Sequence, residues 1–214
     1  MFDICIQNKL LKTPLGNPLQ VPTLALAQAI EKEWEQDSSF HYRQKPLTSL
    51  AATAIERVKE EREAYTTDVI QSISKDAILF WAETPESLVK LQVEKWGPVI
   101  EKVNQALGLS LKSTLSLSIL SLSLEEENKL KEVLDRQTPF KFAGFIHLLS
   151  LTASFCVAFL ILEGQLFAEE GWDLAHLHEH EQRRVWGEDS EALLREESLH
   201  KEFLETIRFL ELIV

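Results

Sequence analysis

The sequence predicts an α+β protein with a small N-terminal α/β domain over residues 1–70 and a larger, mainly helical domain over residues 71–214. Short apolar stretches separated by turn residues occur at the start of the chain, and helical periodicity dominates after Pro22. With 45% hydrophobic and 26% charged residues but only 7 Gly and 7 Pro, the composition excludes a disordered or collagen-like chain.

The first 21 residues are expected to form short strands joined by turns, with a cluster of turn residues at Pro14–Pro18. Thr23 is expected to cap a helix that runs to about Gln36 and carries Ala27, Ile30 and Trp34 on one face. We interpret Trp34 as structural, because it belongs to this apolar face.

A second helix is expected from Thr48, and its faces can be assigned from the spacing of apolar and charged residues. The expected inward residues are Leu50, Ala54 and Val58, and the expected outward residues are Glu56, Lys59 and Arg62. Residues 37–46 before it are polar and irregular.

The middle of the chain is predicted to be helical with one exception. Residues 67–82 have helical periodicity, and Thr84-Pro85-Glu86 is a strong start for a helix that Gly97-Pro98 is expected to interrupt. A further helical segment should reach Gly108. Residues 109–124 alternate polar and apolar, which predicts a strand or hairpin that could pack on the N-terminal domain.

The last third of the chain is predicted to be helical throughout. An amphipathic helix covers residues 125–137, Thr138-Pro139 begins another helix, and breaks are expected near Gly164 and Gly187. The run from 142 to 162 contains no Asp, Glu, Lys or Arg, so its length is compatible with a membrane span. His147 and flanks with little basic bias favour a buried core instead, and a membrane-anchored factor is kept as an alternative.

The net charge of −12 and a pI near 5.0 restrict the partners. Nucleic-acid binding depends on Lys and Arg, so no nucleic-acid partner is expected. The same acidic balance disfavours adhesion to an anionic membrane surface, and no stable membrane insertion is expected. An acidic surface suits basic or apolar protein partners.

The two cysteines, Cys5 and Cys156, do not form a disulfide framework, which fits a reducing compartment. No secretory or transit segment is apparent in the sequence.

One motif could carry chemistry. His176-Leu177-His178-Glu179-His180 contains the H-x-x-E-H pattern of some zinc peptidases, in which both histidines bind the metal and the glutamate acts as base. Few residues follow the motif, and His and Glu are frequent in this charged segment. A zinc peptidase is therefore an alternative rather than the preferred function.

The same segment also has a stripe with helical spacing: Trp172, Ala175, Glu179, Gln182 and Trp186. We expect most of this face to be buried. Glu179 would then be either a structural carboxylate paired with Arg183 or a polar anchor within a partner-binding surface, and the sequence alone does not decide between them. The sequence also does not separate core tryptophans from interface tryptophans among the five in the chain.

Five segments in order, from about residue 3 to residue 195, share a pattern with one family. They are Leu11-Lys12-Thr13-Pro14 to Pro18-Leu19 with Val21-Pro22-Thr23, Leu26-Ala27, Ala29-Ile30, Glu33-Trp34 and Gln36; Pro46-Leu47-Thr48 with Leu50-Ala51 and Thr53-Ala54-Ile55; Asp76 with Ala82, Pro85, Leu88, Gln92 and Trp96-Gly97-Pro98; Thr152-Ala153-Ser154 with Gly164; and Trp172, Glu179, Gln182, Trp186-Gly187 and Glu191-Ala192. Together they resemble the assembly chaperones that bind the α subunit of the F-type ATP synthase head, in mitochondria and alphaproteobacteria.

The resemblance implies a chaperone without enzymatic activity, cofactor or metal. It implies that the chain covers the β-facing surface of the unassembled α subunit until β replaces it. It also implies partner-binding roles for Glu179, Gln182 and Trp186, and a core role for residues 142–162. His178 and His180 depart from the acidic and aromatic neighbours usual in the family. A monomer is expected, in the bacterial cytoplasm or, for a eukaryotic source, the mitochondrial matrix.

Overall fold

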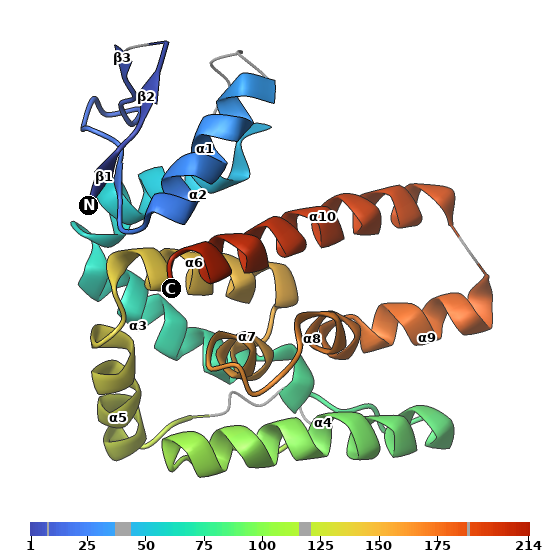
Figure 1. The fold of residues 1–214 in the computed structure, drawn as a ribbon. Coiled ribbons are helices and arrows are strands. Elements are labelled where there is room, and N and C mark those ends of the chain that lie inside the picture. Colours follow the sequence, from blue (N-terminus) through green and yellow to red (C-terminus); the bar gives the residue numbers. More distant parts are fainter. Residues whose placement is uncertain (8, 37–43, 116–120, 188) are drawn as a thin grey trace. The chain divides into compact units, whose positions relative to one another are not determined.

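The computed structural model describes residues 1–7, 9–36, 44–115, 121–187 and 189–214 (Figure 1). Strands lie only near the N-terminus of the described chain, and helices make up most of the remainder, which confirms the mixed α+β class. The strands are β1 (Phe2–Asp3), β2 (Cys5–Ile6), β3 (Lys9–Leu10) and β4 (Gln20–Val21). The α-helices are α1 (Leu24–Gln36), α2 (Pro46–Thr53), α3 (Arg62–Ser72), α4 (Glu86–Leu107), α5 (Leu124–Asp135), α6 (Pro139–Thr152), α7 (Phe155–Leu162), α8 (Ala168–Ala175), α9 (Leu177–Trp186) and α10 (Ser190–Leu212).

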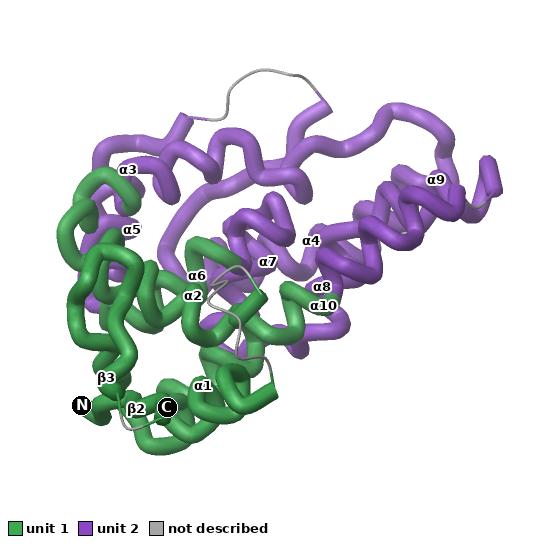
Figure 2. The backbone as a smooth tube through the Cα atoms, turned by 90° about the horizontal axis from the view of Figure 1, so that it is seen from above, with its two compact units in different colours: residues 1–65, 137–147, 201–214 green, residues 66–136, 148–200 purple. Residues whose placement is uncertain are grey.

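The chain forms two compact units, coloured separately in Figure 2. Unit 1 contains residues 1–65, 137–147 and 201–214, and unit 2 contains residues 66–136 and 148–200. This division differs from the sequence-based one at 1–70 and 71–214, because two later segments belong with the strands. Periodicity shows which residues of a helix are buried, but it does not show which distant segment buries them.

Short strands form before residue 22, as the sequence predicts, and they make two antiparallel pairs. Strand β1 pairs with β4, with Phe2 opposite Val21, and β2 pairs with β3 between them in the sequence, with Cys5 opposite Leu10. Gly16, at a φ of 90°, lies in the predicted turn cluster, where its backbone N–H donates to the carbonyl of Thr13.

Helix α1 begins as the sequence predicts. The Thr23 hydroxyl accepts a hydrogen bond from the N–H of Leu26, and Ala27, Ile30 and Trp34 are buried. Glu33 then caps α2, because its carboxylate accepts the N–H groups of Leu47 and Thr48 at 2.8 and 3.0 Å. Burial raises the pKa of Glu33 above its ordinary value, although these hydrogen bonds oppose the rise.

The second predicted helix is α2 followed by a π-helical turn, Ala54–Val58. Leu50, Ala54 and Val58 face inward as expected. The outward assignment of Glu56 is wrong: the residue is buried, and its carboxylate accepts the N–H of Leu15 at 2.7 Å. A buried carboxylate with this partner satisfies a turn N–H, a contact that helical spacing does not reveal.

The core of unit 1 is completed by aromatic residues from α6 and the end of α10. Phe142, Phe145, Phe203 and Phe209 are all fully buried. The start of α1 is also linked directly to the end of α10, because the Thr23 hydroxyl donates to the carbonyl of Leu212. These contacts explain why residues 137–147 and 201–214 belong with the strands.

In unit 2, the helix expected over 67–82 ends early. Helix α3 stops at Ser72 and is followed by two 3₁₀ turns, Ile73–Lys75 and Ala77–Leu79. Asp76 lies between these turns and is completely buried. Its carboxylate accepts the N–H of Ile78 at 3.1 Å and the N–H of Cys156 at 2.9 Å. The carboxylate therefore replaces the helical hydrogen bonds that the periodic pattern predicts.

Helix α4 is continuous, so the interruption expected at Gly97-Pro98 is wrong. A proline inside a helix removes one hydrogen bond and crowds the preceding turn, at a cost of about 3 kcal/mol. The helix offsets this cost by burying one face, whose residues are Gln92, Trp96, Val99, Ile100 and Val103. It ends at Gly108, which has the left-handed conformation that glycine tolerates.

The strand predicted over 109–124 does not form in the described residues 109–115 and 121–124. Thr114 forms a single parallel bridge with Phe80, and residues 116–120 lie outside the described chain. The amide side chain of Asn104 bonds both the N–H and the carbonyl of Leu111. These contacts are within unit 2, and they occupy backbone groups that a hairpin would pair. Helix α5 then begins with a capping box formed by Ser123 and Glu126.

The uncharged run 142–162 is divided between two helices. Helix α6 ends at Thr152, Ala153 adopts a φ of 49°, and Ser154 caps α7 by accepting the N–H of Val157. Seven of the run's residues after this break are buried in unit 2, from Ser154 to Leu160. No helix in the described residues is long and apolar enough to cross a membrane.

Replacing Trp34 tests the interpretation of this residue as structural. Trp34 is buried, and its indole N–H donates to the Thr48 hydroxyl at 3.1 Å. Trp34→Arg should lower the free energy of unfolding by about 3 kcal/mol or more, because it creates a cavity and buries a charge. The measurements are the soluble fraction and urea unfolding. Trp186→Arg, at an exposed site, is the matched control and should remain folded.

Replacing Asp76 tests its structural role. Asp76→Asn should lower the free energy of unfolding by about 2 kcal/mol, because an amide places N–H donors where two backbone N–H groups need acceptors. Urea unfolding measures the change, and Asp68→Asn at an exposed position of α3 is the control. An equal decrease in the free energy of unfolding of both variants would show that the Asp76 carboxylate contributes no more to stability than an exposed one.

The pH dependence of unfolding provides a second test of Asp76. Burial raises the pKa of Asp76 above its ordinary value of 3.8, so the folded chain holds this proton more tightly than the unfolded chain. The contribution of this group to stability should therefore decrease as pH rises from 3.8 through the raised pKa. The difference in unfolding free energy between Asp76→Asn and the parent chain should vary over that interval, and a constant difference would contradict the assignment.

Candidate functional site

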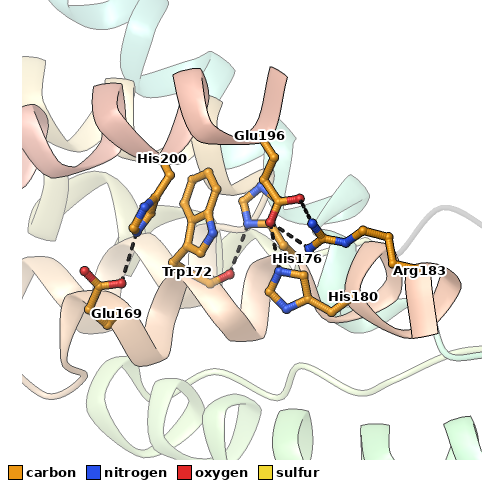
Figure 3. A network of polar contacts seen from close by, with 7 residues as sticks. All are labelled: Glu169, Trp172, His176, His180, Arg183, Glu196 and His200. Carbon is orange, nitrogen blue, oxygen red and sulfur yellow. Dashed lines mark hydrogen bonds and ion pairs between the residues drawn. The ribbon is translucent and has the colours of Figure 1, made fainter. Parts of the chain in front are cut away.

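Helices α8 and α9 are separated by His176, which ends one and precedes the other. Trp172 of α8 is buried, and the His176 ring stacks on it with centroids 3.8 Å apart. His176 Nδ1 lies 3.0 Å from the carbonyl oxygen of Trp172, one of the last carbonyl groups of α8 (Figure 3). The Trp172 side chain is therefore part of the core of unit 2, as its place in the apolar stripe predicts.

Beyond His176 the predicted burial of the stripe is wrong. Helix α9 has no buried residue, and Glu179, Gln182 and Trp186 are all exposed. The Trp186 side chain is 85% exposed, the largest exposure of any tryptophan in the chain's described residues. A large apolar ring on the surface is typical of an interaction site rather than of a folding core.

The three residues singled out from the sequence lie around one open groove in unit 2. Its volume is about 680 Å³, and Glu179, Gln182 and Trp186 all line it. The other wall comes from the start of α10, and the remaining lining residues are His176, Arg183, Gly187, Asp189, Ala192, Arg195, Glu196 and Leu199. The structure thus brings the predicted residues together and adds α10, which the sequence analysis did not include.

The proposed structural pairing of Glu179 with Arg183 is wrong, because Arg183 pairs with Glu196 of α10. Arg183 Nη1 lies 2.7 Å from Glu196 Oε2, and Nη2 donates to Oε1 at 2.8 Å. His180 Nε2 lies 3.0 Å from the same Oε1 atom, so Figure 3 shows one carboxylate between two basic side chains. Partial burial would raise the pKa of Glu196, but the hydrogen bonds from His180 and Arg183 outweigh it and lower the pKa below its ordinary value.

His178 faces α4 rather than the groove. Its ring centroid is 4.9 Å from that of Trp96, and its Nε2 is hydrogen-bonded to Gln92 Nε2. Because Gln92 Oε1 already accepts the N–H of Ala82, the Gln92 amide must donate and His178 Nε2 must accept. Desolvation lowers the pKa of His178, which agrees with a neutral ring at this position.

Glu196 and His200, both on α10, belong to this network but were not predicted from the sequence. His200 Nε2 lies 3.0 Å from Glu169 Oε2, and the His200 ring lies 4.8 Å from that of Trp172. The four-residue spacing of Glu196 and His200 on a helix could have indicated that they share a face. It could not have identified α8 and α9 as the helices opposite them.

The H-x-x-E-H motif does not assemble as a zinc site. The rings of His176 and His180 are 6.5 Å apart, and each has its own partner, the Trp172 carbonyl and the Glu196 carboxylate. Glu179 is exposed beside them on the groove. Among the residues that the structure describes, no group of three His, Cys, Asp or Glu side chains is placed to hold a metal ion.

Comparison with known proteins places the chain in one family. Residues 1–104 match the family model described as ATP12 chaperone protein. The chain is 30% identical over 213 residues to "Protein atp12, mitochondrial" of Schizosaccharomyces pombe, covering 92% of this chain and 73% of the relative.

Two solved structures agree with this assignment. Atp12 from Paracoccus denitrificans superposes with a TM-score of 0.89 at 28% identity, over 99% of this chain and 91% of that one. The Atu1473 protein from Agrobacterium tumefaciens gives a TM-score of 0.91 at 29% identity, over 99% and 80% of the two chains. The chain therefore belongs to the ATP12 chaperone family, whose members are ATP synthase assembly factors and not enzymes.

Proposed function

We propose that this chaperone captures the unassembled α subunit of the ATP synthase head and covers its β-facing surface. The observation that carries the proposal is the groove between α9 and α10, where Trp186 and Glu179 are both exposed. Subunit surfaces that await a partner are apolar and aggregate when uncovered. An exposed tryptophan beside an acidic side chain suits such a surface if it also carries a basic group.

Glu179 is the residue best placed to meet a basic group of the partner. Among the described residues, no side chain forms an ion pair with Glu179, whereas Glu196 is already bound by Arg183 and His180. The Glu179 carboxylate is therefore available, and pairing with it requires no internal contact to break. Gln182 and Trp186 lie along the same helix and would complete the contact surface.

Release requires no nucleotide on the chaperone. Exchange occurs when β binds the same α surface more tightly, so the free energy of β binding drives displacement. We place this exchange in the bacterial cytoplasm or, for a eukaryotic source, in the mitochondrial matrix, and we propose that the chaperone acts as a monomer.

Capture can be measured directly by co-expressing the chain with the α subunit of its own organism, with β omitted, followed by gel filtration. Soluble α that co-elutes with the chain and dissociates when β is added supports the proposal. Aggregation of α in the presence of the folded chain would contradict it.

Charge reversal at Glu179 should weaken capture without unfolding the chain. Glu179→Lys replaces an exposed carboxylate, so circular dichroism and urea unfolding should be unchanged. The affinity for α should fall at least about tenfold, equivalent to about 1.4 kcal/mol. Glu197→Lys, an exposed α10 substitution outside the groove lining that makes the same charge change, is the control. Equal affinity of both variants would remove Glu179 from the site.

Truncation of Trp186 should also weaken capture. Trp186→Ala removes the most exposed ring of the groove and leaves no cavity, because the side chain contacts mostly solvent. Loss of an interface tryptophan costs about 2 kcal/mol or more, so affinity for α should fall roughly thirtyfold. Val93→Ala, at an exposed apolar position on α4, is the control for loss of surface hydrophobicity. Binding titrations with purified α would detect the difference, and an unchanged affinity would place the contact elsewhere.

A further inference from the structure

Helix α9 is held in an unusual way for a helix of a folded protein. Most helices are fixed by an apolar stripe that packs into the core, but α9 has no buried residue. Its sequence, Leu-His-Glu-His-Glu-Gln-Arg-Arg-Val-Trp, is largely polar. The position of α9 therefore depends on partly exposed contacts: the His178 ring against Trp96 of α4 and polar contacts to α10.

The polar contacts between α9 and α10 converge on Glu196. Two parallel hydrogen bonds join the Arg183 guanidinium to this carboxylate at 2.7 and 2.8 Å, and His180 adds a third contact at 3.0 Å. All three side chains are only 22–31% exposed. A two-point Arg–carboxylate pair that is partly shielded from water is stronger and more directional than a surface ion pair.

The other charged pair on α9 cannot perform this role. Arg184 binds Glu181, which is three residues earlier on the same helix, so their pairing links α9 only to itself. His178 contacts Gln92 and Trp96, so it attaches α9 to α4 and not to α10. Glu196 is thus the described residue that joins α9 to the start of α10 through charged contacts.

We propose that Glu196 is a positioning residue: by binding Arg183 and His180 it holds α9 beside the start of α10 and so sets the groove that presents Glu179 and Trp186. Glu196 itself does not need to touch the partner. The effect of Glu196 on capture of the α subunit rests on the proposed function. Its effect on the position of α9 is independent of that function and can be measured on the chaperone alone.

The first experiment measures amide hydrogen exchange of Glu196→Gln in the absence of any partner. Gln keeps the size of the side chain but cannot form the ionic pair. We expect exchange in residues 177–186 to increase at least tenfold, with exchange in α4 and α7 unchanged. Glu197→Gln, one residue later and exposed, is the matched control. Equal protection of α9 in the parent chain and in Glu196→Gln would overturn the proposal.

The second experiment is a charge swap that separates positioning from general damage. Arg183→Glu and Glu196→Arg should each raise exchange in α9, because each leaves like charges facing one another. The double variant restores an ion pair of opposite orientation and should recover most of the protection. Additive loss in the double variant would show that the two residues act independently and would overturn the proposal.

Capture of the α subunit provides the functional readout. Glu196→Gln should lower affinity at least fivefold although Glu179 and Trp186 are intact, whereas Glu179→Lys should lower affinity with α9 exchange unchanged. Increased exchange together with unchanged capture would refute the link between Glu196 and the groove. If the parent chain captures no α subunit but Glu196→Gln still loosens α9, the proposed function fails while the positioning role stands.

Discussion

The buried carboxylate of Asp76 is the contact on which the order of unit 2 depends. It accepts the backbone N–H of Ile78, two residues later, and that of Cys156, 80 residues later. The N–H of Ala77 also donates to the carbonyl of Ala153 nearby. These bonds join the segment after α3 to the junction between α6 and α7. A carboxylate without these donors would be too costly to bury, so the turn at Asp76 and the start of α7 stabilise each other.

The start of α7 in turn orders the helices that lead to the groove. Helix α7 packs against α4 and α8, and the buried indole of Trp96 donates to the carbonyl of Leu174 in α8 at 2.8 Å. Gly171 of α8 approaches Ile161 of α7 so closely that an added Cβ would lie 2.5 Å from its side chain. Close packing therefore extends to Leu174, the last buried residue of α8, and beyond His176 no residue of α9 is buried. The proposed binding residues lie on the less rigidly packed part of unit 2, as is common for binding elements.

Local patterns predicted those elements whose signals are local. The cap at Thr23 and the apolar face with Trp34 agree with the structure because capping and periodicity depend on neighbours in sequence. Helix α4 also begins where Thr84-Pro85-Glu86 predicts, but Pro85 precedes its first residue, Glu86, and no side chain caps it. Several errors involve contacts that helical spacing does not contain: burial of one helix face keeps α4 intact through Pro98, and the Glu56 carboxylate accepts the backbone N–H of Leu15, 41 residues earlier. Strand alternation at residues 109–115 was misleading because the side chain of Asn104 occupies the backbone groups of Leu111.

Helical spacing also predicted only part of the candidate site. Spacing placed Glu179, Gln182 and Trp186 on one face, and the structure confirms that they share a groove, but spacing implied that the face is buried. Trp34 and Trp186 are the same residue type in similar helical patterns, and only the surrounding structure separates a core ring from an exposed one. Glu196 could not be found from its own segment, because its proposed role depends on Arg183 and His180, which lie 13 and 16 residues earlier.

Glu179 and Glu196 illustrate how two carboxylates at one groove acquire different roles from their surroundings. Glu196 is enclosed by Arg183 and His180, so its charge is neutralised internally and contributes to position. Glu179 has solvent on its side of α9, so its charge remains available to an approaching basic group. Exchanging the two surroundings would remove both proposed functions, since an unpaired Glu196 would no longer hold α9 and a paired Glu179 would have no charge to offer. The proposed binding mode therefore uses one carboxylate that is satisfied within the chain and one that is not.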